Sequence, residues 1–430
     1  MQFYLVFRQW KTFENKNRDF EQVALFLCEK FSVSAFFTPG TGNGWGRKQV
    51  LGLGVLKSVN DYEGNHLQKL GQLVDKNNDW IMGHLGYDLK EETEQVYSVK
   101  PNEDGFNDLF FFIPEIVVLH NENGLLIGGM SEEKIDGIAT LIDNYTAATA
   151  LSSPVSLQER TSQSEYFSNS EALLRHIQRG DIYEINYCVD FRGNSSSLEP
   201  ASVFRALQKI SDAPFATLYR NENSWLMCAS PERYMAKNGN RLFSQPMKGT
   251  RRRGNTAAED EVLIHELQND AKERMENVMI VDLVRNDLSR VAQKGTVHVS
   301  ELFGVHSFRT VHQMISTVEC EVREGVSFAE IVGATFPMGS MTGAPKIRAM
   351  QLAEKYEDQS RGIYSGSVGY ITPEKDFDFN VVIRSITWNS QTGNVSAKAG
   401  SALTSTAIPA LEHEECMIKI QAMMNALKRV

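Results

Sequence analysis

The stretch Lys272-Glu-Arg-Met-Glu-Asn-Val-Met-Ile-Val-Asp-Leu-Val-Arg-Asn-Asp-Leu288 lies within residues 257–292, which are mostly helix-compatible and contain no proline. This part of the sequence therefore predicts helix, and residues 412–430 at the end of the chain predict another. Strand-like runs lie between them, at residues 365–372, 379–387 and 394–399. Because strands and helices are interspersed without a strict βαβ rhythm, we expect a mixed, largely antiparallel α+β fold.

One shift in composition divides the chain. Residues 147–164 are poor in aromatic residues and rich in small polar ones, which is typical of a connector. The sequence therefore predicts an amino-terminal lobe at residues 1–150 and a second domain at residues 163–428. Within the first, Asn121-Glu-Asn-Gly124 stands between two apolar runs and predicts a β-hairpin.

The overall composition indicates a folded protein with an acidic surface. Of its 430 residues, 42% are hydrophobic and 23% charged, which excludes wholesale disorder. The 44 basic residues against 54 acidic ones give a net charge of −10, so nucleic acid is a poor partner. An anionic ligand would need positive charge supplied locally.

The cysteines and apolar runs bear on the compartment. Five cysteines are widely spaced without a CxxC pair, so neither a zinc ribbon nor a disulfide framework is indicated. The amino terminus lacks the pattern of a secretion signal, and no apolar run is long enough to span a bilayer. We expect a reduced, cytoplasmic protein without membrane association.

Two pairs of glutamates have helical spacing. Glu273 with Glu276 and Glu412 with Glu415 are three residues apart, so each pair shares one helix face. A solvated face explains such pairs more often, and Asp270 could cap the first helix. Apolar residues follow both pairs, however, and carboxylates that begin buried helices are suited to hold Mg²⁺.

The decapeptide Gly339-Ser-Met-Thr-Gly-Ala-Pro-Lys-Ile-Arg combines glycines, a proline and a lysine. Pro345 at the first position of a helix would leave free backbone N–H groups beside Lys346, which together could bind an anion. The order of a phosphate P-loop is absent, and a plain loop entering a helix is the commoner meaning.

Four single residues could take part in chemistry. Lys248 in a dry pocket would lose its proton and become a nucleophile, although most such lysines are surface residues. Glu232 could donate a proton if burial raises its pKa. His312 lies among apolar residues and is more often a core group, whereas Arg384 in an apolar strand needs a partner such as a substrate carboxylate.

In their order along the chain, the motifs between about residues 164 and 427 resemble those of the chorismate-utilising enzymes. The matching segments are Gly180-Asp-Ile-Tyr-Glu-Ile-Asn, Ser230-Pro-Glu-Arg-Tyr, residues 272–288, Phe336-Pro-Met-Gly-Ser-Met-Thr-Gly-Ala-Pro-Lys and Tyr364-Ser-Gly-Ser-Val-Gly-Tyr. The resemblance implies an α+β fold, a two-lobed complex sandwich of largely antiparallel sheets with outer helices and an active site between the sheets.

Within this family the chain most resembles the aminodeoxychorismate synthases, because Pro246-Met-Lys-Gly-Thr matches their Pro-Ile-Lys-Gly-Thr. Anthranilate synthases have alanine in place of Lys248. The resemblance implies that Lys248 attacks chorismate, that ammonia then replaces it to give 4-amino-4-deoxychorismate for folate biosynthesis, and that Glu232 is the acid/base. The alternatives are an anthranilate synthase component I, an isochorismate-forming relative, or a catalytically silent chorismate-binding subunit.

The resemblance also assigns the remaining residues. Glu273 or Glu276, together with Glu412 and Glu415, match carboxylates that bind Mg²⁺, which would hold the ring carboxylate of chorismate. His312 matches an active-site histidine. The residues that match substrate-binding positions are Thr342, Lys346, Tyr364, Arg384, Ala399, Gly400 and Ser401.

Two departures and one absence qualify this resemblance. Ser401 and Ala402 replace glycines of a loop whose backbone N–H groups hold a carboxylate, and Glu184 stands where glutamine is common. None of the cysteines stands in the Gly-x-Cys-x-Gly setting of a glutaminase nucleophile. We therefore expect free ammonia, or ammonia from a separate glutamine amidotransferase subunit (component II), as the nitrogen source.

Overall fold

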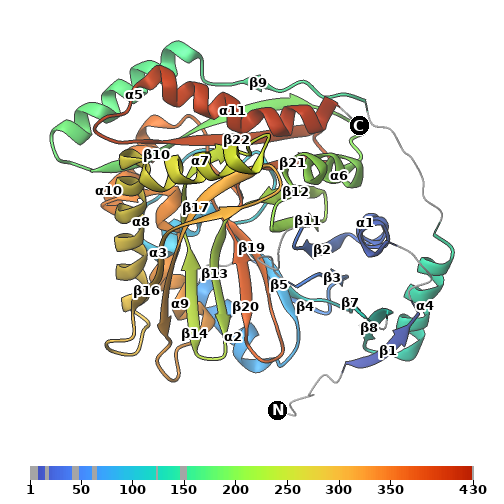
Figure 1. Cartoon of the computed structure of the whole chain (residues 1–430). Coiled ribbons are helices and arrows are strands. Elements are labelled where there is room, and N and C mark those ends of the chain that lie inside the picture. The colour runs from blue at the N-terminus through green and yellow to red at the C-terminus, as the bar shows by residue number, and fades with distance from the viewer. Residues whose placement is uncertain are drawn as a thin grey trace.

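The computed structural model describes residues 8–14, 19–40, 48–60, 65–122, 124–145 and 153–428. Within these ranges the chain forms two sheets of 12 and 10 strands that face each other, with helices on their outer sides (Figure 1). The strand pairings are antiparallel, as in β10 (Glu184–Asn194) with β22 (Asn394–Leu403). The expected α+β sandwich with outer helices is thus confirmed.

The first strand of the chain, β1, and the last, β22, both belong to the larger sheet. Its order is β1 (Gln9–Phe13), β8 (Gly124–Gly129), β7 (Ile116–Asn121), β3 (Val50–Leu53), β2 (Val33–Thr38), β11 (Phe215–Asn221), β12 (Ser224–Ser230), β21 (Ser385–Asn389), β22, β10 and β18 (Gly343–Ala344), with β9 (Gln158–Glu159) also on β10.

The smaller sheet also combines strands from distant parts of the chain. Its order is β15 (Met247–Arg252), β17 (Val311–Glu321), β14 (Arg241–Gln245), β13 (Arg233–Asn238), β20 (Phe377–Asn380), β19 (Ser367–Ile371), β5 (Ile81–Leu85), β6 (Leu109–Ile113) and β4 (Lys57–Asn60), with β16 (His298–Ser307) also on β17.

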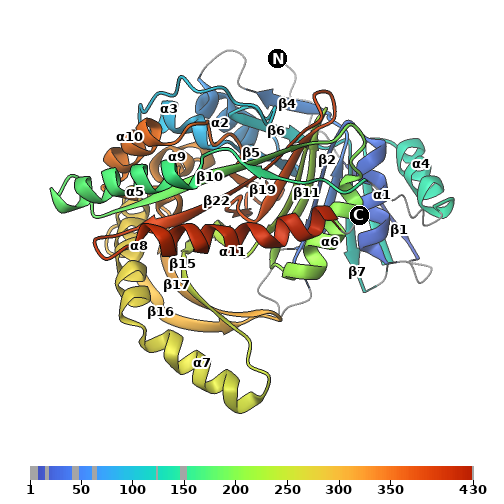
Figure 2. The same cartoon turned by 90° about the horizontal axis from the view of Figure 1, so that it is seen from above.

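The helices cover the outer faces of the sheets. They are α1 (Phe20–Lys30), α2 (His66–Lys76), α3 (Lys90–Thr93), α4 (Glu132–Asp143), α5 (Gln163–Gln178), α6 (Pro200–Ser211), α7 (Ala257–Asn269), α8 (Ala271–Ser289), α9 (Phe328–Thr335), α10 (Lys346–Tyr356) and α11 (Pro409–Lys428), with 3₁₀ turns η1 (Tyr87–Leu89) and η2 (Gly339–Met341). Helices α1, α5, α6 and α11 pack on the larger sheet, and α2, α8 and α9 on the smaller one. Helix α7 extends away from the other elements (Figure 2).

Apolar residues fill one end of the space between the sheets. Phe37, Met82, Phe112, Leu226 and Val368 belong to a single buried cluster drawn from both sheets. Strands β2 and β12 are buried along their whole length, because helices cover one face and the other sheet covers the opposite face. The remaining end of this space is polar and contains Lys248 and Glu184.

The elements expected from the sequence are largely present. The hairpin is confirmed as β7 and β8, and strands lie in all three strand-like runs. The helix predicted within residues 257–292 is confirmed as two helices, α7 and α8, which meet at Asp270. That residue has extended dihedral angles and caps α8 by accepting from the N–H groups of Lys272 and Glu273.

The predicted connector does not separate the sheets into two domains. It lies partly outside the described residues, and the described part contains β9 and the first residues of α5. Strand β2 pairs with β11 and β5 pairs with β19, so the segments 1–150 and 163–428 contribute to both sheets. None of the helices in the described ranges combines the length and apolar character needed to cross a bilayer.

Arg361 is a buried junction of three elements. Its guanidinium donates to the Glu357 carboxylate over 2.6 Å and 2.9 Å, to the Met341 carbonyl over 2.6 Å and to the Asn186 carbonyl over 2.8 Å. The end of α10, the 3₁₀ turn η2 and strand β10 are thereby held together. With its side chain 2% exposed, this arginine is shielded from water.

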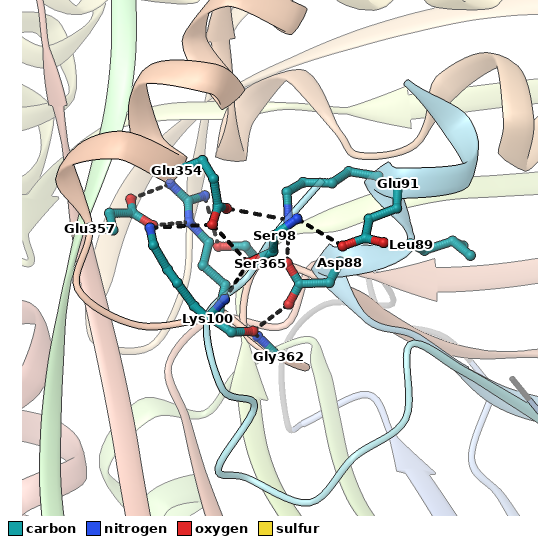
Figure 3. A network of polar contacts seen from close by, with 12 residues as sticks. Asp88, Leu89, Glu91, Ser98, Lys100, Glu354, Glu357, Gly362 and Ser365 are labelled. Carbon is teal, nitrogen blue, oxygen red and sulfur yellow. Dashed lines mark hydrogen bonds and ion pairs between the residues drawn. The ribbon is translucent and has the colours of Figure 1, made fainter. Parts of the chain in front are cut away.

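A second set of polar contacts adjoins this junction and joins residues 88–100 to α10 (Figure 3). Ser98 donates to Glu354 over 2.7 Å, and Lys100 lies 3.5 Å from the same carboxylate. Ser360 donates to Asp88, which also pairs with Lys90. The amino-terminal segment thus supports the part of the chain that leads to Tyr364.

We predict that Arg361→Leu lowers the free energy of unfolding by about 3–5 kcal/mol, because it leaves Glu357 buried without its cation. The control is Arg285→Leu, which removes a half-exposed pair with Asp282 and costs at most about 1 kcal/mol. Chemical denaturation followed by tryptophan fluorescence measures both. Equal losses in the two variants would contradict the role given to Arg361.

Candidate active site

Lys248 lies on β15 at an edge of the smaller sheet. Its Nζ donates a hydrogen bond of 2.5 Å to Oε1 of Glu184 and lies 3.6 Å from Oε2 of Glu276. Glu184 belongs to β10 of the larger sheet and Glu276 to α8, so three elements meet at this amine. Gly249, with φ of 75°, lets α8 pack closely against β15, because a Cβ at this position would lie only 3.0 Å from Oε2 of Glu273 on α8.

These contacts decide the charge of Lys248. Burial alone lowers the pKa of its ammonium, but Glu184 and Glu276 outweigh burial and raise that pKa above its ordinary value. The expectation that a dry pocket leaves this amine neutral is wrong, because the pocket contains two acidic partners. Lys248 becomes a nucleophile only after another group has taken its proton.

Glu184 is a site residue that the sequence reasoning did not assign. Its side chain is 2% exposed, and Oε2 has no hydrogen-bond partner among the described residues. Gly343, at φ of 147°, lets β18 lie against β10 here, since a Cβ would come within 2.2 Å of the Glu184 carbonyl oxygen. The sequence did contain one indication of this role, because Glu184 stands where the chorismate-utilising enzymes commonly have glutamine.

Glu232 lies where the chain crosses from β12 of the larger sheet to β13 of the smaller one. Burial raises the pKa of its carboxyl to about 7, although a hydrogen bond from Ser340 and the charges of Lys248 and Lys419 act in the opposite direction. Its carbonyl accepts from the N–H of Val381 over 3.0 Å, which fixes the backbone. A carboxyl with this pKa can hold or release a proton near neutral pH.

Arg384 lies at another crossing between the sheets, from β20 to β21. The strand predicted at residues 379–387 is wrong as one strand, because the chain leaves one sheet after Asn380 and joins the other at Ser385, with Arg384 at φ of 51°. Burial lowers the pKa of its guanidinium, which within the described residues has no ion pair or hydrogen bond. Such an arginine is suited to receive a carboxylate.

Lys346 is paired inside the protein. Its Nζ donates to Asp287 over 2.7 Å and to the carbonyl of Thr335 over 3.3 Å. Helix α10 begins at Lys346 with Pro345 as its N-cap, one residue later than expected. These contacts indicate that Lys346 positions the loop before α10, and its direct contact with an anion stays a prediction that this geometry does not favour.

Thr342 and Tyr364 lie in buried loops beside the Arg361 junction. The Thr342 hydroxyl faces the carbonyls of Met338 and Gly339, at 3.3 Å and 3.2 Å. Burial raises the pKa of the Tyr364 phenol, which is therefore neutral and able to donate. Their contact with a ligand stays a prediction.

Ala399, Gly400 and Ser401 lie inside β22, paired with β10, and do not form the loop that the resemblance implies. The expectation is wrong in this respect, and Ser401 at a family glycine position suits an extended backbone. The Ser401 and Tyr166 hydroxyls lie 2.9 Å apart, and Lys419 donates to the Gly400 carbonyl over 2.7 Å. Helices α5 and α11 thus hold this strand from outside.

His312 lies on β17, fully buried, with both ring nitrogens in contact. The Nδ1 atom lies 2.8 Å from the Ser307 hydroxyl and Nε2 lies 2.8 Å from Oδ1 of Asp260 on α7. The ring thus joins the projecting helix α7 to the sheet. Because these two contacts occupy both ring nitrogens, neither is free to exchange a proton with a ligand in this arrangement. A catalytic role for His312 therefore stays a prediction.

Of the four glutamates expected to bind Mg²⁺, three contact lysines and one faces an arginine. Lys272 Nζ lies 3.2 Å from Oε1 of Glu412 and 3.8 Å from Oε1 of Glu276, and Lys419 lies 2.6 Å from Glu415. Glu273 faces Arg251 at 3.9 Å. In the part of the chain that the structure describes, no three acidic, histidine or cysteine side chains are placed together to hold a metal ion.

The residues nevertheless fit a divalent ion in two respects. The Oε1 atom of Glu276 is buried and accepts no hydrogen bond from the described residues, and an ammonium group lies beside it and Glu412. Burial raises the pKa of Glu276 to about 7 and also raises the pKa of Glu412, which reflects a shortage of compensating positive charge. Carboxylate oxygens are the ligands that Mg²⁺ prefers.

Comparison with known proteins gives a consistent result. Residues 43–425 match the family described as chorismate binding enzyme. A probable chloroplastic aminodeoxychorismate synthase of Oryza sativa is 32% identical over 403 residues, covering 84% of this chain and 44% of the rice protein. Aminodeoxychorismate synthase component 1 of Bacillus subtilis is 30% identical, covering 81% of this chain and 76% of that protein.

The chain therefore spans less than half the length of the plant relative. Curated anthranilate synthases match at similar identity. The crystal structure of anthranilate synthase component I from Streptococcus pneumoniae superposes with a TM-score of 0.78 at 21% identity, covering 88% of this chain and 92% of that one, so the two share a fold. The matched region begins at residue 43 and is longer than the motifs alone indicate.

We predict that Glu184→Gln lowers the pKa of Lys248, because it removes the nearer of the two carboxylates that raise it. More of the amine is then neutral at a given pH, so an amine-acetylating reagent modifies Lys248 faster below the wild-type pKa. Mass spectrometry of peptides labelled across a pH series, with EDTA present, measures the shift. An unchanged or raised pKa would contradict this account, and exposed Lys294 serves as the internal control.

Proposed function

Because the chain belongs to the chorismate binding enzyme family, we propose that it is an aminodeoxychorismate synthase, which converts chorismate and ammonia to 4-amino-4-deoxychorismate. The relatives that carry this name support the reaction type. The observation that carries the proposal is Lys248, whose buried Nζ lies between two sheets at 2.5 Å from the Glu184 carboxylate.

The first step joins Lys248 to the substrate. Lys248 first releases its proton to solvent, a step that its pairing with Glu184 opposes, and the neutral amine then attacks the second ring carbon of chorismate. Both conjugated double bonds of the ring shift as the hydroxyl at the fourth carbon leaves. Glu232, protonated up to a pKa of about 7, donates the proton with which that hydroxyl departs as water.

The second step replaces the lysine. Ammonia attacks the fourth ring carbon, both ring double bonds shift back, and the bond between the second carbon and Lys248 breaks to restore the amine. The guanidinium of Arg384, which has no ion pair or hydrogen bond within the described ranges, is suited to hold a substrate carboxylate during both steps, because its planar donors match two carboxylate oxygens. The buried surroundings exclude competing water.

A divalent ion completes this proposal. Glu276 and Glu412, with Glu273 and Glu415 on the same two helices, would hold Mg²⁺. When bound, it would neutralise the ring carboxylate of chorismate. In this proposal the covalent steps take place at Lys248 and Glu232, and the ion would only help to hold chorismate.

The nitrogen source completes the list of partners. We infer that a separate glutamine amidotransferase subunit supplies ammonia, and the relative named component 1 supports a partner of this kind. The product is a precursor of para-aminobenzoate and hence of folate.

The second candidate is an anthranilate synthase, since relatives with that name have similar identity. Lys248 favours the first candidate, because an amine within the site has no role in direct addition of ammonia. A silent chorismate-binding subunit is disfavoured by a lysine enclosed between the sheets beside Glu184 and by a carboxyl, that of Glu232, titrating near neutral pH.

We predict that the protein, incubated with chorismate, Mg²⁺ and ammonium, releases aminodeoxychorismate, identified by mass and by the absence of anthranilate fluorescence. Lys248→Ala lowers kcat by roughly 10²-fold or more, because the covalent route is lost. Exposed Lys294→Ala is the matched control. Anthranilate formed directly would overturn the proposed function, and full turnover in Lys248→Ala would overturn its mechanism.

We further predict that kcat falls as pH rises through about 7, because Glu232 must be protonated to act as the acid. Glu232→Gln lowers kcat by roughly 10²–10⁴-fold and removes this limb of the pH profile. Exposed Glu324→Gln is the control and keeps the profile. A pH limb that persists in Glu232→Gln would assign it to another group.

A further inference from the structure

Lys272 makes an ion pair across two helices. It is the second residue of α8, and its Nζ lies 3.2 Å from Oε1 of Glu412 on α11 and 3.8 Å from Oε1 of Glu276 on its own helix. The same ammonium therefore contacts one carboxylate from each of the two pairs that resemble metal ligands.

The two carboxylates need a cation. Their side chains are 6% exposed for Glu276 and 5% for Glu412, and Oε1 of Glu276 accepts no hydrogen bond within the described residues. Buried carboxylates without positive charge nearby are costly. Lys248 on the other oxygen of Glu276 compensates only part of this charge, because Glu184 shares it.

Lys272 differs from its partners in exposure. Its side chain is 44% exposed, so the ammonium can move into water by rotation of its own stem. The carboxylates have no such freedom, since both helices are packed against the sheets. The contact is therefore one that a competing cation can displace without moving the backbone.

We propose that Lys272 is an internal counter-cation that lies between Glu276 and Glu412 until a divalent ion displaces it. This inference rests on the metal component of the proposed function and on no other part of it. The ammonium keeps the two carboxylates compensated when no ion is bound, and its displacement lowers the affinity for the ion. Lys272 is thus a residue that sets metal affinity without being a ligand.

The test measures Mg²⁺ binding to the full chain by titration calorimetry with MgCl₂ alone. We expect Lys272→Met to bind Mg²⁺ several-fold to about tenfold more tightly, the range set by losing one partly exposed ion pair. Lys272→Arg keeps the charge and is expected to bind as the wild type does. The control Arg285→Met removes a positive charge elsewhere on α8 and changes affinity little.

Thermal unfolding supplies a readout that is independent of activity. Lys272→Met is expected to unfold at a lower temperature than the wild type in EDTA, and to gain more from added Mg²⁺. Equal or weaker Mg²⁺ binding by Lys272→Met, or an equal gain in Arg285→Met, would overturn the inference while leaving the proposed reaction intact. Absence of Mg²⁺ binding in the wild type and every variant would overturn both the inference and the metal component, and the product assay decides the reaction separately.

Discussion

The hydrogen bond between Lys248 and Glu184 is the constraint on which the polar end of the sandwich depends. It joins β15 of one sheet to β10 of the other, across a space that at its far end is filled by residues such as Phe37 and Phe112. A buried carboxylate alone would be costly, and so would a buried ammonium. Each makes the other tolerable, so the sheets can enclose charged groups that chemistry requires.

The geometry around that pair follows from where the chain changes sheets. Glu232 lies at the crossing from β12 to β13, and Arg384 lies at the crossing from β20 to β21. Backbone in such crossings leaves the regular strand ladder, which frees side chains to point between the sheets. The N–H of Val381 donates to the carbonyl of Glu232, so the two crossings support each other.

The sequence predicted the helices and strands better than it predicted the protonation states of the site residues. Helices, the hairpin and most strands follow from local pattern, and the capping Asp270 that divides the first helical region is also a local signal. The break before Arg384 could not be predicted, because its apolar run reads as one strand whichever sheet each half joins. The charge of Lys248 depends on Glu184, 64 residues earlier in the chain, and no spacing rule relates them.

The acidic groups of the site serve more than one cation, and this couples their properties. Glu276 contacts Lys272 through Oε1 and Lys248 through Oε2, so a change at either oxygen alters the field at the other. Groups that share a partner in this way are not additive in their effects. The raised pKa of Glu276, caused first by burial, follows from the same arrangement, since the positive charge around it is shared with Glu184 and Glu412. The four glutamates, of which Glu276 and Glu412 are buried and Glu273 and Glu415 partly exposed, therefore act as one negatively charged cluster that shares its cations, not as a set of independent ligands.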